Sequence, residues 1–412
     1  MADDDDRFNA AREHFNTGLA ALQAGQPAQA EQALRQSLAL LPGRASTQLN
    51  LAVALLRQDR AAEALPLLDA VLAQTPDDVD ALGHRGAALN QLQQPEQAAP
   101  VFQRLVQIAP QRPQAWFHLA QTLQMLGHPD QALPAYERCL ALQPGHAAAC
   151  SQRGTALREL GRLDEAAAAF EQALALGDDD AGFNAYYLAA LRGGSGAPPQ
   201  APPAYVQGLF DDYAADFDRH LVDKLDYHAP AALQRLLLGP GIGRSAFGEV
   251  LDLGCGTGLC APLLRPLAQR LLGVDLSAAM LRAAAARGLY DELQQADLVP
   301  HLQALAASGR RVELLVAADV LIYLGDLAPL FAAAARVLAP GGLFAFSVEI
   351  APPEQPFVLQ PSLRYAHGEA ALRRLAAAHG LQPLRDERGL LRVEQGQPVA
   401  GQYWVLQAGA QA

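Results

Sequence analysis

The sequence is poor in cysteine and in positive charge. Its 412 residues include four cysteines, which lack both the spacing of metal ligands and the density of a disulfide framework. We therefore expect no metal site and a reducing compartment, the cytoplasm. Lys and Arg total 31 against 43 Asp and Glu, which gives a net charge of −12. This argues against nucleic acid as the main partner, because phosphate neutralisation requires clustered Lys and Arg.

Long apolar runs are also missing. No stretch reaches the roughly 20 residues of a membrane-spanning helix. The first ten residues, MADDDDRFNA, are acidic where a secretory signal is basic and then apolar. We expect no membrane partner. Hydrophobic residues still make up 51% of the chain, and its length suggests two or three domains.

The first half of the sequence repeats with a period of 34 residues. A proline series, an alanine series and a series of glycine or alanine share this period in a fixed phase. Small residues let the two helices of a hairpin touch, and the proline stops the second helix. The three series are Pro42, Pro76, Pro110 and Pro144; Ala30, Ala64, Ala98, Ala132 and Ala166; and Gly18, Ala52, Gly86, Ala120 and Gly154.

This pattern resembles the tetratricopeptide repeat family over roughly residues 11–180, as five units. Trp116 and Tyr136 occupy large slots of the fourth unit, and Asp178 replaces the proline of the fifth. The resemblance implies an all-α solenoid over 11–192, with the apolar helix 181–192 as its cap. It also implies a protein or peptide partner on the concave face.

One position in each first helix, from the second unit onward, carries a neutral hydrogen-bonding side chain: Asn50, His84, His118 or Gln152. These side chains form a ladder that pairs with a partner's backbone, or they line a solvated groove wall. The basic clamp of chaperone-binding members of the family is not visible, which disfavours a chaperone role.

A change of composition separates the two halves. Residues 193–204, GGSGAPPQAPPA, are predicted to be an interdomain linker because Gly and Pro dominate them. From 205 to 410, apolar strands alternate with helices, which predicts a mostly parallel, doubly wound α/β sheet that binds its ligand beyond the strand ends. The strands are expected at 249–253, 271–275, 312–319 and 343–350, with an antiparallel hairpin over 390–408.

The first strand runs into the glycine loop LDLGCGTG. Its later part fits the dinucleotide pattern G-x-G-x-x-A, but such a match alone is weak. Asp252 lies in the strand end and Asp275 ends the next strand. These acids would oppose a pyrophosphate and would favour a ligand that carries an ammonium and a sulfonium.

The domain resembles the class I S-adenosylmethionine-dependent methyltransferases over nearly all of 205–408. The segments LDLGCGTG, GVDLS, QADL, LLVAADVLIYLGDL and LAPGGLFAFSVE follow the family's order. The resemblance implies a Rossmann-like, seven-stranded sheet of order 3-2-1-4-5-7-6, with strand seven antiparallel, and S-adenosyl-L-methionine as cofactor. The loop glycines would pass against the methionine part of the cofactor, Asp275 would accept the ribose hydroxyls and Asp297 would meet the adenine. The expected cofactor-binding residues are Tyr213, Asp252, Gly254, Cys255, Gly256, Gly258, Asp275, Leu276, Met280, Asp297, Leu298 and Asp319.

The acceptor side is less defined. Residues 205–230 are aromatic and acidic; they form a lid over the cofactor, as the family's leading helix does, or a packing helix at the sheet edge. Asp319 faces the reacting centre or caps the next helix. The catalytic candidates are Asp319, Tyr323 and His367, with His220 as a further possible base. Residues 351–365 form a long irregular segment that is expected to line the acceptor pocket, where Arg364 could bind an anionic substrate.

Two functions fit the sequence. The first is a methyltransferase whose repeats recruit a protein, with a protein side chain or a small molecule as the methyl acceptor. The second is a non-catalytic repeat scaffold whose methyltransferase-like domain only binds cofactor. The intact loop glycines and Asp275 favour the first. A dehydrogenase is a distant third.

Overall fold

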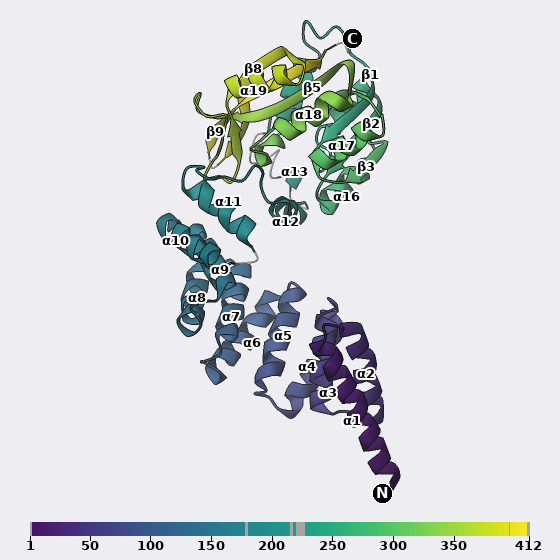
Figure 1. Cartoon of the computed structure of the whole chain (residues 1–412), viewed down its shortest axis with the longest axis vertical. Helices are drawn as coiled ribbons and strands as arrows, with labels where there is room; N and C mark the ends of the chain where they lie inside the picture. The colour runs from purple at the N-terminus through teal and green to yellow at the C-terminus, as the bar shows by residue number, and fades with distance from the viewer. Residues whose placement is uncertain (1, 178–179, 215–216, 220–226, 395, 410–412) are drawn as a thin grey trace. The chain divides into compact units, whose positions relative to one another are not determined.

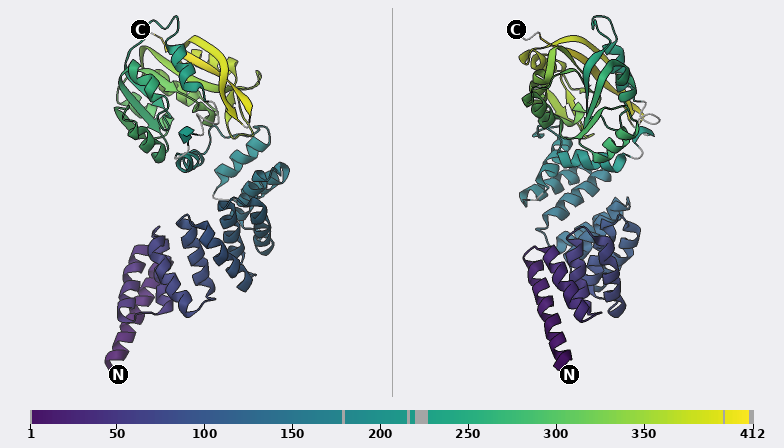
Figure 2. Two further views of the ribbon diagram at one scale, coloured as in Figure 1. Left: turned by 180° about the vertical axis from the view of Figure 1, so that it is seen from behind. Right: turned by 90° about the vertical axis from the view of Figure 1, so that its right-hand side faces the viewer.

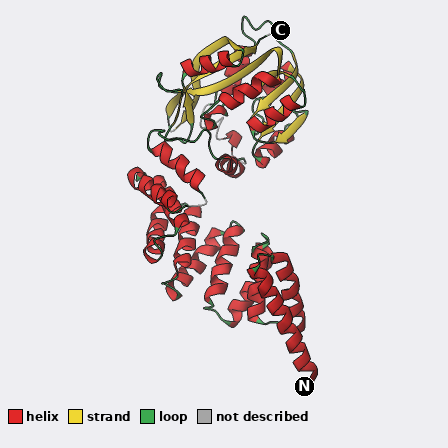
Figure 3. Cartoon of the chain, viewed as in Figure 1, coloured by secondary structure: helices red, strands yellow, loops and turns green. Residues whose placement is uncertain are grey.

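The computed structural model describes residues 2–177, 180–214, 217–219, 227–394 and 396–409. These residues form two compact units, Met1–Ala181 and Gly182–Ala412 (Figure 1). The first unit is built from helices and the second from helices and strands (Figure 3). None of the described helices is both long enough and apolar enough to span a bilayer.

The N-terminal unit is a series of helix hairpins, as the 34-residue period predicted. Each proline of the first series directly follows the C-cap residue of a second helix: Leu41, Thr75, Ala109 or Gln143. The helices are α1 (Ala2–Gln23), α2 (Pro27–Leu40), α3 (Ala45–Leu56), α4 (Ala61–Gln74), α5 (Val79–Gln91), α6 (Pro95–Ile108), α7 (Pro113–Met125), α8 (Pro129–Leu142), α9 (Ala147–Glu159) and α10 (Leu163–Ala175).

The small residues of the repeat mark the points where paired helices touch. A Cβ atom on Gly86 of α5 would lie 2.4 Å from the Phe102 ring of α6, and a Cβ on Gly154 would lie 2.7 Å from the Phe170 ring. Both rings are fully buried. The glycine therefore recurs because the facing ring leaves no room for a side chain.

The C-terminal unit contains a nine-stranded sheet within the described residues. Its parallel part has the order β3-β2-β1-β4-β5, and β9 then pairs with β5 antiparallel and with β8. This confirms the predicted core order and the terminal hairpin. The strands are β1 (Phe247–Leu253), β2 (Ala268–Asp275), β3 (Glu292–Gln295), β4 (Val312–Ala317), β5 (Leu338–Ile350), β6 (Phe357–Leu359), β7 (Tyr365–His367), β8 (Leu381–Glu394) and β9 (Gln397–Ala408).

The sheet differs from the seven-stranded prediction at one edge. Residues 351–365 were expected to be irregular, but β6 and β7 form a small antiparallel ribbon whose β7 pairs with the end of β5. Aromatic and β-branched residues in these short runs favour extended backbone despite the surrounding prolines.

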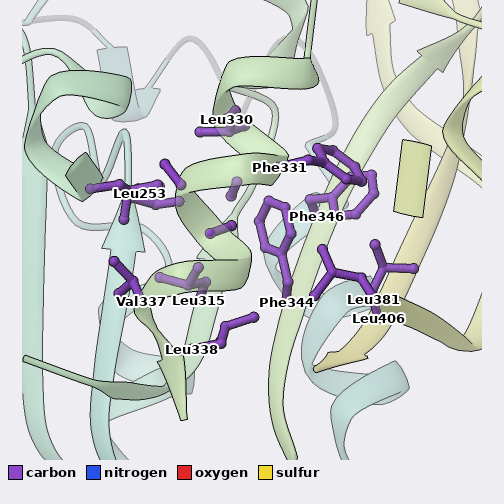
Figure 4. Close-up of a cluster of buried hydrophobic side chains, with 14 of the residues drawn as sticks. Leu253, Leu315, Leu330, Phe331, Val337, Leu338, Phe344, Phe346, Leu381 and Leu406 are labelled. Atoms are coloured by element: carbon purple, nitrogen blue, oxygen red, sulfur yellow. The ribbon is translucent and has the colours of Figure 1, made fainter. Parts of the chain in front are cut away.

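Helices cover both faces of the sheet (Figure 2). One face packs against α17 (Leu298–Ala307), α18 (Ala328–Val337) and α19 (Glu369–Ala378), and Figure 4 shows part of this core, with Phe331 beside Phe346. The other face packs against α14 (Ala229–Leu237) and α15 (Ala261–Leu264). Helix α16 (Ala278–Ala286) follows β2.

Helix α11 (Ala181–Leu191), predicted to cap the solenoid, belongs instead to the C-terminal unit. Its Tyr186 is fully buried in a cluster with Tyr323 and Tyr365, and its hydroxyl donates to the carbonyl of Leu363. Tyr186 of α11 therefore packs within the C-terminal unit.

The segment predicted as a linker is also bound to the C-terminal unit, and we call residues 197–203 the strap. The Pro199 carbonyl accepts the backbone N–H groups of Gly325 and Asp326 at 2.9 and 2.8 Å, and the Ala201 N–H donates to the Tyr323 carbonyl at 2.8 Å. Its Gly and Pro residues therefore form an extended segment that is hydrogen-bonded along a loop, not an unattached linker.

Candidate functional site

A cavity of about 700 Å³ opens beyond the carboxyl ends of β1, β2 and β4. This is where doubly wound sheets bind ligands, and the volume lies within the roughly 300–1,000 Å³ of small-molecule sites. Its wall includes most of the predicted cofactor residues: Gly254, Cys255, Gly256, Asp275, Leu276, Met280, Asp297, Leu298 and Asp319.

Glycine is required at each of the three loop positions for a different structural reason. All have positive φ: +64° at Gly254, +55° at Gly256 and +86° at Gly258. A Cβ on Gly254 would lie 2.3 Å from Val320, and one on Gly258 would lie 3.1 Å from Arg287. At Gly256 the nearest atom, on the Phe217 ring, is 3.8 Å away. Gly256 is thus the loop glycine at which a side chain would have open space; Gly254 also lines the cavity, whereas Gly258 does not.

Asp275 ends β2 with its carboxylate at the cavity wall. One oxygen accepts the Gly256 N–H at 2.8 Å and the other accepts the Ser277 N–H at 2.9 Å. Burial raises the pKa of Asp275. Since a carboxylate oxygen has more than one acceptor site, both oxygens can still take a hydroxyl donor from a ligand.

Asp252 does not line the cavity. Its side chain is 1% exposed and accepts a hydrogen bond from the Tyr290 hydroxyl at 2.7 Å. Burial raises the pKa of Asp252 to about 7. The structure therefore places this predicted ligand residue beneath the loop, as a buried support.

The aromatic, acidic segment before the sheet packs over the loop, through α12 (Pro203–Tyr213) and the short α13 (Phe217–Arg219). Asp211 accepts hydrogen bonds from the Ser277 hydroxyl and from the Ala279 N–H, at the start of α16. Asp218 binds the Thr257 hydroxyl and the Arg287 guanidinium. The acids of α12 and α13 thus attach these helices to the start of α16 and to the glycine loop. The Tyr213 side chain and His220 lie outside the described residues.

Asp319 follows β4 with φ +57°, a left-handed conformation that few non-glycine residues adopt. Its N–H donates to the Ser347 hydroxyl at 2.8 Å. The Arg392 guanidinium donates to both of its carboxylate oxygens, at 3.0 and 2.9 Å. Arg392 is 2% exposed and also pairs with Glu349. An ion-pair network therefore fixes Asp319 at the cavity wall.

Sequence reasoning missed Arg392, Glu349 and Glu394. A weak signal existed, because Arg392 and Glu394 alternate in β8 and so share one face of the sheet. Asp319, the partner of Arg392, is 73 residues away in sequence, and no local pattern reports such a pairing.

The two remaining catalytic candidates differ in position. Tyr323 lines the cavity, and burial raises its pKa, so its hydroxyl stays protonated at neutral pH. His367 is not in the cavity wall. It is 2% exposed, its Nε2 lies 2.8 Å from the Leu324 carbonyl, and burial lowers its pKa to about 4. His367 is therefore a neutral donor to the backbone, and the prediction that it acts at the site is wrong.

The strap forms part of the same cavity. Gln200, Ala201 and Pro203 line it, next to Phe210 of α12. Gln200 also forms an isolated antiparallel bridge with Leu324. The prediction missed this wall because a Gly/Pro-rich composition alone indicates a linker.

Comparisons with known proteins agree with this architecture. A family model described as a methyltransferase domain matches residues 250–342, and models described as tetratricopeptide repeats match residues 21–85, 89–133 and 117–181. A solved structure of MamA from Desulfovibrio magneticus aligns with 40% of this chain and 94% of its own, at 21% identity and a TM-score of 0.39. That likeness is too weak to bear on function.

Curated relatives match the C-terminal part. The malonyl-[acyl-carrier protein] O-methyltransferase of Salmonella typhimurium is 29% identical over 187 residues, 44% of this chain and 68% of that protein. The trans-aconitate 2-methyltransferase of Pseudomonas aeruginosa is 34% identical over 147 residues, 35% of this chain and 44% of that protein. The chain spans less than half the length of most curated relatives that it matches. The chain is a tetratricopeptide repeat protein fused to a methyltransferase domain of Rossmann-like fold.

Proposed function

We propose that the C-terminal unit is an S-adenosyl-L-methionine-dependent methyltransferase and that the repeats bind a protein partner. One observation carries the enzymatic part. The carboxylate of Asp275 and the open backbone of Gly256 meet at one wall of a cavity at the strand ends. A hydroxyl-bearing sugar and a close backbone approach are both accommodated there.

The described residues fit the cofactor. Asp275 would take the ribose hydroxyls, Asp297 and Leu298 would meet the adenine, and Gly256 would pass against the methionine part, where a side chain would intrude. The bound cofactor supplies an electrophilic methyl group on a sulfonium. The chain's task is then to align the acceptor and to exclude water.

Helices α12 and α13, acting as a lid, provide that exclusion together with the strap. Phe210 and Phe217 contribute aromatic edges to the cavity, with ring centroids 5.8 Å apart, and Phe210 packs edge-on against Tyr323 at 5.6 Å. Asp319, held by Arg392, places a fixed negative charge beside the same space. A fixed carboxylate in a cavity of low dielectric favours a cationic sulfonium.

The repeat unit's role rests on its family and on the half-buried polar ladder. Burial lowers the pKa of His84 and of His118, so both are neutral at pH 7. Two members of the ladder already bond within their own helix: Asn50 donates to the Ser46 carbonyl, and His118 lies 3.1 Å from Gln121. We propose that a peptide partner binds this side of the solenoid through neutral hydrogen bonds.

The acceptor of this protein is not fixed by its relatives. Their names include a small molecule, trans-aconitate, and a protein-borne group, malonyl on acyl carrier protein. Both acceptor classes therefore stay open, although both of these molecules carry a carboxylate. The alternative function is a repeat scaffold whose C-terminal unit binds cofactor without turnover.

Calorimetric titration of the full chain with S-adenosylmethionine and S-adenosylhomocysteine tests the proposal. We expect dissociation constants in the micromolar range, weakened at least tenfold in Asp275→Asn. Asp164→Asn, an exposed acid of α10, is the matched control and should bind as the wild type does. A folded protein that gives no heat with either ligand would refute both the enzyme and the cofactor-binding scaffold.

A further inference from the structure

We infer that the methyl acceptor is a carboxylate on an apolar body, bound by Arg364 and converted into a methyl ester; this rests on the function proposed above. Arg364 lies between β6 and β7 and lines the cavity with its side chain 21% exposed. A mostly buried guanidinium at the wall of a ligand cavity is the natural partner of a planar anion.

Arg364 has donors to spare. Among the described residues its carboxylate partner is Glu394, which accepts from one terminal nitrogen. Arg364 also interacts with the Tyr323 hydroxyl, and both side chains line the cavity. A guanidinium offers five N–H donors, so this side chain can take a further anion.

Glu394 has a second possible partner, Arg392. Its carboxylate lies 3.5 Å from Nε of Arg392, and that nitrogen is buried without a hydrogen-bond partner. A buried unsatisfied donor is costly. A short move of the Glu394 carboxylate would give Nε of Arg392 a hydrogen-bond partner and would free the guanidinium of Arg364. An entering carboxylate would then replace Glu394 as the partner of Arg364.

Of the carboxylates in the described cavity wall, Asp275 and Asp297 are assigned above to the cofactor, which leaves Asp319, Glu394 and the Tyr323 hydroxyl as candidate bases for the acceptor. Tyr323 stays protonated, and Asp319 is held by two hydrogen bonds from Arg392. Burial alone would raise the pKa of Glu394, but Arg364 and Arg392 lower it below its usual value. An alcohol or an ammonium would need a base, whereas a carboxylate is already ionised at pH 7.

The transfer step balances without a proton. A carboxylate oxygen lone pair forms the new C–O bond with the methyl carbon, and the electron pair of the broken S–CH3 bond stays on sulfur. The products are a methyl ester and S-adenosylhomocysteine. Opposite charges disappear in this step, and a water-poor cavity favours such a reaction. The aromatic edge of Phe210 against Tyr323 provides an apolar surface beside Arg364 for the body of the acceptor.

The test titrates the full chain, saturated with S-adenosylhomocysteine, with three probes of one shape: 4-phenylbutanoate, 4-phenylbutan-1-ol and 4-phenylbutan-1-amine. We expect the carboxylate to bind at least tenfold more tightly than the other two. Arg364→Met should abolish this preference, Arg364→Lys should keep part of it, and Glu394→Gln should strengthen carboxylate binding because the internal competitor is gone. Arg388→Met, an exposed arginine 66% accessible at its side chain, should behave as the wild type does.

If Arg364 had only a structural role, Glu394→Gln should weaken carboxylate binding as Arg364→Met does. That result would overturn the inference. Equal or tighter binding of the alcohol or the amine would overturn it too, as would no binding of any probe at about 10 mM, a concentration at which even weak millimolar affinities register. A second readout uses [methyl-³H]S-adenosylmethionine and a metabolite extract. Methyl esters release volatile labelled methanol in mild base, whereas ethers and methylamines do not. Base-stable product would refute the carboxylate but keep the methyltransferase, while failure to bind S-adenosylhomocysteine would refute the proposed function itself.

Discussion

The buried acid beneath the glycine loop should make the stability of the C-terminal unit depend on pH. Asp252 has a pKa of about 7 in the fold against an ordinary value of 3.8. Between these values the folded state holds a proton that the unfolded state has lost, so stability falls as pH rises and levels off above the folded pKa. While the two states differ by one bound proton, stability changes by about 1.4 kcal/mol for each tenfold change in proton concentration. The expected loss from Asp252 is therefore about 2 kcal/mol between about pH 5.5 and 8.5.

Asp252→Asn should remove this pH-dependent loss of stability, because the amide cannot ionise and its oxygen still accepts from the Tyr290 hydroxyl. As pH rises across that range, the free energy of unfolding of the variant should increase by about 2 kcal/mol relative to that of the wild type. Asp275, whose pKa is also raised by burial, contributes a slope of the same sign in both proteins.

Urea unfolding followed by tryptophan fluorescence provides the measurement. The chain has two tryptophans, so Trp116→Phe leaves the fully buried Trp404 as a reporter of the C-terminal unit. A stability difference between the wild type and Asp252→Asn that does not change with pH would show that the carboxyl group is ionised in the fold, and would refute the reasoning.

Four further substitutions test the contacts above. Gly256→Ala should weaken S-adenosylhomocysteine binding at least tenfold in calorimetry, and its left-handed backbone should cost about 1–2 kcal/mol of stability. Gly254→Ala should add about 1–3 kcal/mol of overpacking to the same backbone strain. Equal unfolding midpoints for these two variants would contradict this difference. Gly86→Ala should lower the thermal midpoint of the repeat unit through a clash with Phe102, and Phe102→Leu in the same chain should restore part of it, as circular dichroism would show. Arg392→Met should cost about 3–5 kcal/mol in urea unfolding by stranding buried carboxylates, and a loss below about 1 kcal/mol would mean that these carboxylates are solvated or protonated.

The sequence predicted those features that a local pattern encodes. The spacing of the prolines and glycines follows from helix ends and from glycine–ring contacts such as Gly86 on Phe102. The order of the central strands and the position of Gly256 and Asp275 at their ends follow from apolar runs that stop at glycine or acid.

The features that depend on distant pairing could not be predicted. The Arg392 network joins a loop after β4 to a hairpin at the end of the chain, and no nearby residue marks that contact. The imidazole of His367 and its expected loop position favour a catalytic role, but the structure buries it against a backbone carbonyl. The strap was judged by composition, which does not report what an extended chain is hydrogen-bonded to.

The strap also bears on how the catalytic half can be produced alone or exchanged between proteins. A fragment that starts at Tyr205, where regular α/β patterning begins, would lose the hydrogen bonds that Pro199 and Ala201 make to the loop after β4, together with one wall of the cavity. It would also leave the hole that Tyr186 fills beside Tyr365. A fragment that starts before Ala181, the first residue of α11, keeps all of these contacts. Chimaeras that join this methyltransferase domain to a different recruitment module should therefore be joined before α11, not within the Gly- and Pro-rich residues 193–204.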